Sequence, residues 1–432
     1  MPPVDAATAI WGVTTTIFAP TPSVAAFARH VHGSSLVVVG DKKTDPGPWK
    51  AFTKAHENTA YLSPHDQMAL DMKFVRLLPW NHFGRKNVGF LYAIRRGAQW
   101  VFDFDDDNLL HTLSLLPDLL GGVGVARNVH VMRTRSHLYN PYPDFRPVNE
   151  QGLPIFMWPR GFPLDFILSN DTYTQSADGV IDTARVVVFQ SLADHNPDVD
   201  AIFRMTRSLP VTFDRAGAVV AIPAGVYTPW NAQATLWRRK ALWGSLLPIT
   251  VTGRVTDIWR SYLVERLLWE TGDAIAFTSP FVTQFRNAHS YSKDFSDEGD
   301  LYTKANQLLA TLSAWTSPRE EALLAPAFID LYRALHRAGI LGALDVELAQ
   351  LWVEDLNASE YVWPTVSTRH PARKLPLAPI VDERRNEIST SALKPHPRHG
   401  ADQSAKNNSP PGSAKAKLRQ VRDFLSSAPR NM

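Results

Sequence analysis

Apolar runs alternate with segments of helical periodicity along the first 110 residues. Short runs predicted as strands occur at 9–19, which is rich in β-branched residues, and at 34–41, 58–63 and 98–104. Between them lie segments with helical spacing of apolar residues, which open on Thr-Pro or Ser-Pro or stop at Gly; they are 21–31, 63–72 and 84–97. Strands separated by such helices predict βαβ units, an α/β fold class and a mostly parallel sheet flanked by helices.

The pattern changes twice farther along the chain. Residues 120–300 are less regular and rich in Trp, Tyr and Pro, which indicates ordered loops around a site, and 255–270 form a strongly amphipathic helix pattern. Residues 301–357 are predicted as helices broken at Gly339. We therefore expect a domain at 1–300, a C-terminal helical extension at 301–367, and a disordered basic tail at 368–432.

Composition excludes several classes of protein. The 432 residues are 44% hydrophobic with 13 Trp and 21 Phe, which excludes disorder along the whole chain. There is no Cys, hence no disulfide framework and no Cys-based zinc site. We find no apolar run of about 18 residues and no secretory signal pattern. These observations predict a cytoplasmic protein without a transmembrane span.

The net charge of +3 is unevenly distributed. From Thr368 onward there are 13 Lys and Arg against 5 Asp and Glu, so the preceding chain is mildly acidic. The basic residues are spread out and are not interleaved with aromatic residues. We therefore expect no specific nucleic-acid binding, and only weak, salt-sensitive contact of the tail with an anionic surface.

The segment "WVFDFDDDNLL" (100–110) places four carboxylates at the end of an apolar strand. Asp103, Asp105, Asp106 and Asp107 would repel one another without a counter-charge. In the simplest interpretation, Asp107 or Asn108 caps a following helix and the other carboxylates face water. Four such groups at the end of a buried strand instead favour a bound cation or compensating Arg and Lys.

Two kinds of enzyme place carboxylates in this position. A phosphatase of the haloacid dehalogenase type has Asp-x-Asp after an apolar strand, and "VFDFD" fits with Asp103 as nucleophile, but the usual Gly-Thr continuation is absent. A GT-A glycosyltransferase uses Asp-x-Asp to hold Mg²⁺ or Mn²⁺, which bridges the diphosphate of a nucleotide-sugar. The position of the motif, at the fourth predicted strand, favours the glycosyltransferase.

Longer segments show a family resemblance. "VVVGDKKT", "LPWNHFGRKNVGFLYAIRRGAQWVFDFDDDN", "NPYPDF", "WPRGFPL", "DAIFRMTR", "PAGVYTPWNAQATLW" and "RVTDIWRSYLVERLLWE", in this order, resemble the STELLO-type family of GT-A glycosyltransferases. The resemblance covers about residues 10–315, and the acidic signature is also similar to that of plant UDP-arabinopyranose mutases. Plant members carry an N-terminal membrane anchor that is not seen here, so we do not carry over their Golgi residence.

The resemblance implies roles for the acidic residues. Asp105 and Asp107 would form the Mn²⁺ or Mg²⁺ site, Asp107 as the direct ligand and Asp105 also in contact with the ribose or a metal-bound water, with Asp106 and Asn108 supporting them. Asp103 shares a strand face with Asp105 and either joins the metal site or pairs with a buried basic residue. His289, in a polar loop late in the domain, is the candidate for a further metal ligand; as an alternative it is an exposed loop residue.

Other residues are candidates for binding the donor nucleotide. Asp41 and Thr14 to Thr16 follow or end strands and would contact the base or ribose, or else serve as turn and strand residues. The cluster Arg85, Lys86 and Asn87 opens a helix, where basic residues oppose the helix dipole, so we expect a bound phosphate there.

The remaining candidates concern transfer and the acceptor. An inverting transferase needs a carboxylate base, and Asp257 is the candidate; its alternative role is a helix N-cap. Substrate-binding residues are predicted to be Trp158, Arg160, Trp230, Asn231 and Arg260. The predicted partners are a nucleotide-sugar, most simply a UDP-sugar, and a glycan or other acceptor; the alternative function is a non-catalytic scaffold of a glycan-synthesis complex.

Overall fold

The computed structural model describes residues 9–30, 33–111, 128–173, 176–213, 219–286, 290–318 and 323–367. All of them fall within residues 1–375, the first of two units into which the chain divides. The predicted disordered tail at 368–432 and the candidate ligand His289 lie outside the described residues.

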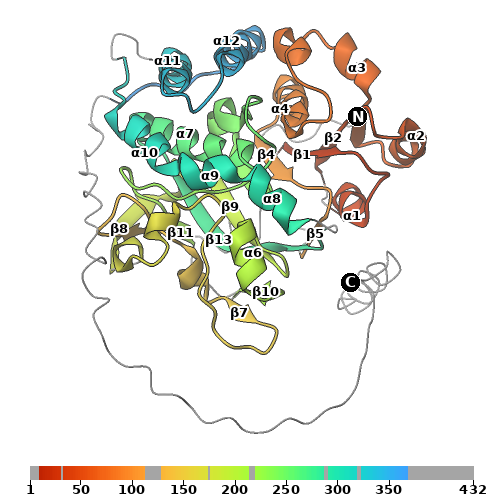
Figure 1. Ribbon diagram of the computed structural model, residues 1–432. Coiled ribbons are helices and arrows are strands. Elements are labelled where there is room, and N and C mark those ends of the chain that lie inside the picture. The colour runs from red at the N-terminus through yellow and green to blue at the C-terminus, as the bar shows by residue number, and fades with distance from the viewer. Residues whose placement is uncertain are drawn as a thin grey trace, which may run out of the picture. The chain divides into compact units, whose positions relative to one another are not determined.

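Four parallel strands open the sheet, in the order β3-β2-β1-β4. They are β1 (Ile10–Thr16), β2 (Ser35–Gly40), β3 (Thr59–Leu62) and β4 (Trp100–Phe104). The helices that connect them are α1 (Pro22–His30), α2 (Pro46–Ala55), α3 (Pro64–Ala69) and α4 (Lys86–Arg95). This part of the molecule, in red and orange in Figure 1, has the βαβ organisation predicted from the sequence.

Both faces of this parallel part are covered, because successive strand residues point to opposite sides. In β2, Val37 and Val39 belong to one hydrophobic core, whereas Leu36 and Val38 belong to a second. Helix α4 packs on the first face and α1 on the second. A strand that is buried on both faces has a continuous apolar run in its sequence, as in the segment 34–41.

The sheet continues beyond β4 with mixed strand directions, in the order β12-β9-β13-β11-β6-β8. These strands are β12 (Ala234–Arg238), β9 (Val186–Asp194), β13 (Ala274–Gln284), β11 (Val220–Ala221), β6 (Asn128–Arg133) and β8 (Ser176–Asp182). The short β5 (Asn108–Leu110) pairs with β13, while β7 (Val148–Asn149) and β10 (Val211–Thr212) form a separate ribbon. The predicted α/β class, a sheet flanked by helices, is confirmed.

Strand direction decides which loops meet at one edge of the sheet. Strand β12 is antiparallel to both β4 and β9, and β13 is parallel to β9. The start of β12 therefore lies at the same edge as the ends of β1, β2, β4, β9 and β13. In open α/β sheets this edge is where ligands bind.

The remaining helices lie between the later sheet strands or after the last of them. They are α6 (Ala201–Thr206), α7 (Thr256–Thr271), α8 (Tyr291–Asp297), α9 (Gly299–Thr303), α10 (Ala305–Ala314), α11 (Leu324–Arg337) and α12 (Ala343–Ala358). Short 3₁₀ turns occur at Lys73–Arg76, Phe83–Arg85, Tyr142–Phe145, Leu164–Phe166, Asn170–Thr172, Thr183–Arg185 and Arg239–Ser245. No described helix is at once long and apolar enough to cross a lipid bilayer.

Helices α11 and α12 lie side by side at one end of the molecule (Figure 1) and are built into the main core. The ring of Trp352 in α12 packs 5.4 Å from that of Phe74, and its indole N–H donates to the Trp243 carbonyl at 2.9 Å. Gly339, where the sequence predicts a break, lies between the two helices with a φ of 71°. The helices predicted at 301–357 thus share one core with the sheet.

Candidate functional site

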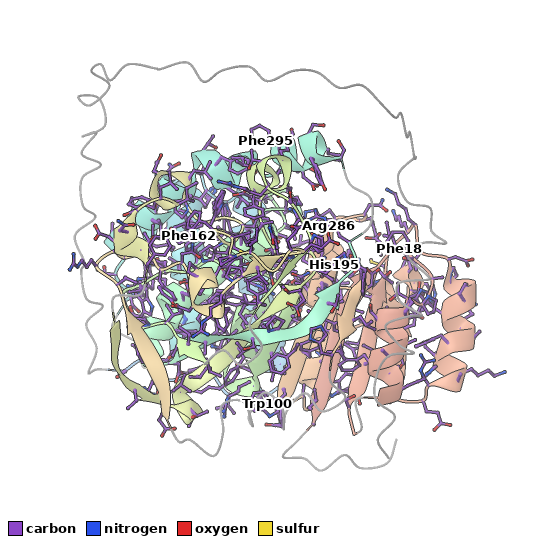
Figure 2. All side chains as sticks on the ribbon, turned by 90° about the horizontal axis from the view of Figure 1, so that it is seen from below. Phe18, Trp100, Phe162, His195, Arg286 and Phe295 are labelled. Atoms are coloured by element: carbon purple, nitrogen blue, oxygen red, sulfur yellow. The ribbon has the colours of Figure 1, made fainter. Side chains whose placement is uncertain are left out.

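A cavity of about 360 Å³ opens at this edge of the sheet. Its lining comes from the ends of β1, β2, β4, β9 and β13, from the start of β12 and of α7, and from two further segments, one before α4 and one that holds Arg160. The residues are Thr15, Thr16, Ile17, Phe18, Asp41, Lys43, Asn81, His82, Phe83, Asp105, Asp106, Asp107, Arg160, Asp198, Asn231, Gln233, Arg254, Asp257, Gln284 and Arg286. Figure 2 labels two of them, Phe18 after β1 and Arg286 after β13. Strand directions alone thus bring distant parts of the chain into one site.

The carboxylates that follow β4 turn into this cavity. The backbone N–H of Asp105 donates to Asn108 Oδ1 at 2.9 Å, which fixes the turn, and β5 begins at once and pairs with β13. Asp106 accepts a hydrogen bond from the Thr16 hydroxyl, and Asp107 Oδ1 accepts one from Gln284 Nε2 at 3.4 Å. The sequence alternative in which Asp107 or Asn108 caps a helix is wrong, because a strand follows.

The three carboxylates are electrostatically costly to ionise in the absence of a cation. The pKa of Asp105 is raised to about 8, mainly by burial and also by the neighbouring charge of Asp107, against the opposing effect of Lys86. Burial and the adjacent Asp106 raise the pKa of Asp107 to about 6. Burial also raises the pKa of Asp106, although the Thr16 hydrogen bond opposes this. A positive ligand at this place would remove the repulsion.

Asp103 lies beneath the cavity in a buried ion network and does not line it. One of its oxygens is 2.5 Å from Lys86 Nζ and the other is 3.0 Å from Arg260 Nη1, and all three side chains are buried. The alternative in which Asp103 pairs with a basic residue therefore describes the structure. A buried, doubly paired carboxylate cannot reach a substrate, so the phosphatase interpretation with Asp103 as nucleophile does not fit.

The basic cluster at the start of α4 makes internal contacts. Lys86 Nζ lies 3.5 Å from Asp105 Oδ1 and donates to the carbonyls of Phe104 and Ala232. Arg85 donates to Gln67 Oε1 and to two backbone carbonyls, and Asn87 exchanges two hydrogen bonds with the Leu247 backbone. None of the three lines the cavity, so a direct contact with phosphate does not follow from their positions. Lys86 instead places a positive charge close to the Asp105 carboxylate without lining the cavity itself.

Asp41 lines the cavity beside β1 and also makes a turn. Its Oδ1 accepts a hydrogen bond from the Lys42 backbone at 2.7 Å, and its own N–H donates to the Thr44 hydroxyl. Strands β2, β1 and β4 are successive neighbours, so Asp41 and Asp105 are two strand positions apart at one crevice. Asp41 and Asp105 therefore lie at the same edge of the sheet.

Asp257 lies in the first turn of α7 and faces Arg160 across the cavity wall. Its two oxygens accept from Arg160 Nη2 at 2.8 Å and Nη1 at 3.2 Å. They also accept the backbone N–H groups of Ala232 at 3.2 Å and Ile258 at 3.0 Å. Arg160 Nε pairs with Asp198 at 2.8 Å. Burial alone would raise the pKa of Asp198, but the charge and hydrogen bond of Arg160, together with the charge of Arg254, lower it overall. Arg160 thus joins two carboxylates.

The other predicted substrate contacts divide into one at the cavity and three in the core. Asn231 lines the cavity and accepts from Gln190 Nε2 at 3.0 Å. Trp158 donates its indole N–H to Asp200 at 2.7 Å and packs against Phe203. The guanidinium of Arg260 lies over the rings of Trp230 and Trp237, at 5.5 and 5.1 Å. Trp158, Trp230 and Arg260 do not line the cavity, because packing and internal hydrogen bonds hold them elsewhere.

Several lining residues are absent from the sequence prediction. The charged ones are Lys43, Asp198, Arg254 and Arg286. Each lies in a polar segment just after a strand or just before a helix, which is the signal that identified Asp41 and Asp257. That signal was insufficient, because the sequence does not reveal that β12 runs antiparallel and so brings the ends of β9 and β13 to this edge.

The carboxylate oxygens of the aspartate run could provide some of the ligands of a hard divalent cation. Carboxylate oxygens are the ligands that Mg²⁺ and Mn²⁺ prefer, and burial with mutual repulsion raises the pKa of Asp105 and Asp107, which a bound cation would oppose. Among the described residues, however, no three His, Asp or Glu side chains converge as a ligand group. The described protein atoms therefore offer an incomplete ligand set, which leaves room for oxygen atoms of water or a phosphate.

Comparison with known proteins gives the class. Residues 254–394 match the family model described as STELLO glycosyltransferases. Over 82% of the chain the sequence is 28% identical to probable glycosyltransferases STELLO2 and STELLO1 of Arabidopsis thaliana. The chain spans about half the length of these curated relatives, 45% of each. These matches show that the chain is similar to glycosyltransferases of the STELLO type. The resemblance seen in the sequence motifs is to the same family.

Two solved structures are similar at low score. One is the mannosyltransferase PcManGT from Pyrobaculum calidifontis in complex with GDP-Man and Mn²⁺, at 12% identity and a TM-score of 0.32 over 83% of this chain and 84% of that one. The other is S. aureus TarS 1-349 in complex with UDP, at 13% identity and a TM-score of 0.32 over 82% and 90%. At these scores the likeness carries no argument about the site.

Proposed function

We propose that this protein is a metal-dependent glycosyltransferase that takes a sugar from a nucleotide-sugar donor, a UDP-sugar in the simplest case. The observation that carries the proposal is the cavity at the ends of parallel strands β2, β1 and β4, into which three repelling carboxylates turn. A cation that carries a diphosphate fits such a site, and the STELLO-type family match supports a sugar as the transferred group.

The donor side of the cavity would be formed by the first three strand ends. Asp105 and Asp107 would hold Mg²⁺ or Mn²⁺, with His289 as a further candidate ligand from outside the described residues. The ion would supply positive charge to the leaving diphosphate. Asp41 and the Thr15 hydroxyl would contact the ribose or base, and Phe18, 47% exposed at the rim, would offer a ring face to the base. The acceptor would enter toward Asn231 and Asp257.

Asp257 is the proposed base for the acceptor hydroxyl, and its contacts set a condition. A carboxylate has about four acceptor positions, and four donors already occupy those of Asp257. To accept a proton, Asp257 would have to lose one of these four hydrogen bonds. The hydrogen bonds from Arg160 would break or shift when the acceptor binds. Asp257→Asn should leave UDP binding unchanged within about threefold and abolish sugar transfer, because the amide cannot take up the proton.

The first test is a calorimetric titration of UDP with and without Mn²⁺. In wild type, UDP should bind strongly only when metal is present, because the ion joins the carboxylates to the phosphate. At metal and nucleotide concentrations about 100-fold above their dissociation constants, the free energy of unfolding should rise by roughly 2.7 kcal/mol for each. Asp107→Asn should keep the fold and lose most of this response.

The matched control is Asp171→Asn, which makes the same change at an exposed carboxylate that does not line the cavity. It should bind UDP and Mn²⁺ as wild type does. UDP binding that is independent of metal, or normal binding by Asp107→Asn, would end the proposal that this aspartate run is the donor site.

A further inference from the structure

Cationic side chains line the cavity next to the aspartate run. Arg160, Arg254 and Arg286 come from three separate segments: the loop before β8, the residues that precede α7, and the residues that follow β13. Their side chains are only 5%, 20% and 8% exposed. Solvated surface arginines would be far more exposed, so these three form part of the built wall of the cavity.

Each guanidinium is held in place by an acid. Arg254 Nε donates to Glu298 at 2.9 Å, and Arg286 Nη2 donates to Asp294 at 2.9 Å. Glu298 is itself fixed, because it accepts the backbone N–H of Ala201 at 2.8 Å. A charged group that is already oriented loses little conformational freedom when it binds a ligand.

The arginines still repel one another despite these partners. The pKa of Arg204, which does not line the cavity, is lowered to about 9, mainly by burial and also by the charges of Arg286 and Arg254. The pKa of Arg286 is lowered by burial and then by the charge of Arg254. Closely spaced positive groups of this kind are stabilised by an anion.

Strand pairing sets the place of Arg286 relative to the aspartates. Strand β13 pairs with β5, with Gln284 opposite Asn108, and the backbone N–H of Phe285 points to the Asp107 carbonyl at 3.4 Å. Arg286 therefore follows directly on the residues that meet the end of the aspartate run. The acidic and basic parts of the wall are neighbours.

A ligand that satisfies both parts must present positive charge to the carboxylates and negative charge to the arginines beside them. A metal-bound diphosphate does this. We infer that Arg286 and Arg254 bind the terminal phosphate of the donor's diphosphate and stabilise the charge that it gains when the sugar departs. The inference rests on the proposed function and names two catalytic residues for it.

The chemical step balances without a further reactant. The bond between the sugar's anomeric carbon and the terminal phosphate oxygen breaks, and its electron pair stays on that oxygen. A bond forms between the anomeric carbon and the acceptor oxygen, whose proton passes to a base. The leaving diphosphate gains one negative charge, and preoriented arginine donors lower the energy of that charge.

The test compares UDP with UMP at saturating Mn²⁺, since only UDP carries the terminal phosphate. In calorimetric titrations, Arg286→Gln and Arg254→Gln should each lose about 10- to 100-fold in UDP affinity, and less than about threefold in UMP affinity. The rate of donor hydrolysis or transfer should fall at least as much. Arg185→Gln, a control at a half-exposed arginine paired with Asp273 away from the cavity, should change neither affinity.

Loss of Arg286 removes a cation from the buried Asp294, so a double variant guards against misfolding. The double variant Arg286→Gln/Asp294→Asn removes one positive and one negative charge, so the net charge is unchanged, and it leaves a hydrogen-bonding side chain at each position. It should show the same selective loss of UDP affinity. If wild type binds UDP in a metal-dependent way and all the arginine variants keep its preference for UDP over UMP, the inference is overturned while the proposed function stands. If wild type shows no metal-dependent UDP binding, the proposed function itself fails.

Discussion

At the scale of single residues, the aspartates after β4 fall into two groups with opposite surroundings. Asp103 is neutralised by Lys86 and Arg260, whereas Asp105 and Asp107 face the cavity with raised pKa values. Asp103 lies within β4 beside Lys86 and Arg260, whereas β4 ends at Phe104 and the turn fixed by Asn108 directs the following carboxylates to the cavity. Carboxylates of the same run can therefore be tested separately.

The stability of the metal-free protein should fall as pH rises through the range in which Asp107 and Asp105 titrate. Their folded pKa values, about 6 and about 8, exceed those of the unfolded chain, so their stabilising contribution is complete below about pH 4 and is lost as pH rises through these values. Mg²⁺ binds the ionised forms. The increase in melting temperature caused by Mg²⁺ should therefore be larger at pH 8 than at pH 5, and Asp105→Asn should reduce the difference. Equal increases at both pH values would contradict this.

Asp103→Asn should be strongly destabilising although the residue lies outside the cavity. The amide keeps the shape but deprives the buried Lys86 and Arg260 of their shared counter-charge, which costs about 3–5 kcal/mol. Asp297→Asn, which breaks the exposed pair with Lys293, should cost less than about 1 kcal/mol. Urea unfolding of both variants measures the difference, and similar costs would show that the buried network contributes little.

At the scale of elements, the sequence predicted the parallel half of the sheet because each strand and helix there carries its own local signal. Ser63 caps α3 through a capping box, and the strand at 34–41 is apolar on both faces because both are buried. The mixed half was beyond such reasoning, because β11 has two residues and the direction of β12 is set by tertiary pairing. Local signals therefore predict Asp41 and Asp257 as site residues, but they do not predict Arg254 and Arg286.

Gly161 is a point where two elements meet too closely for a side chain. Its φ is +82°, and an added Cβ would lie 2.3 Å from Ile258 Cγ2 in α7. Gly161→Ala should lower the free energy of unfolding by about 1–3 kcal/mol more than Gly152→Ala, which has a similar φ of +73° but open space around it. Because Arg160 is the preceding residue, the same variant should also weaken UDP binding. Equal effects of the two substitutions in urea unfolding would refute the close approach.

At the scale of the whole molecule, the C-terminal helices complete the core of the sheet domain. Trp352 in α12 packs on Phe74 and donates its indole N–H to the Trp243 carbonyl, and Asp345 accepts the backbone N–H of Ile249 at 2.6 Å. The helical extension is therefore needed by the part of the chain that forms the cavity.

Two truncations should behave differently for this reason. A chain that ends at Ser367 should melt within a few degrees of the full chain, because the composition of 368–432 offers little apolar surface to bury. A chain that ends at Ser317 loses α11 and α12, exposes large apolar rings and should not unfold cooperatively. A marked drop in melting temperature for the longer of the two truncated chains would show that the tail packs.

The spread of the cavity lining from Thr15 to Arg286 has a kinetic consequence. A site assembled from so many distant segments exists only when nearly all long-range pairings are in place, which for a sheet of this topology comes late in folding. A ligand that binds only the finished site stabilises the native state but not the folding transition state. Metal and UDP should therefore slow unfolding and leave the refolding rate almost unchanged, so that donor binding extends the lifetime of the folded protein.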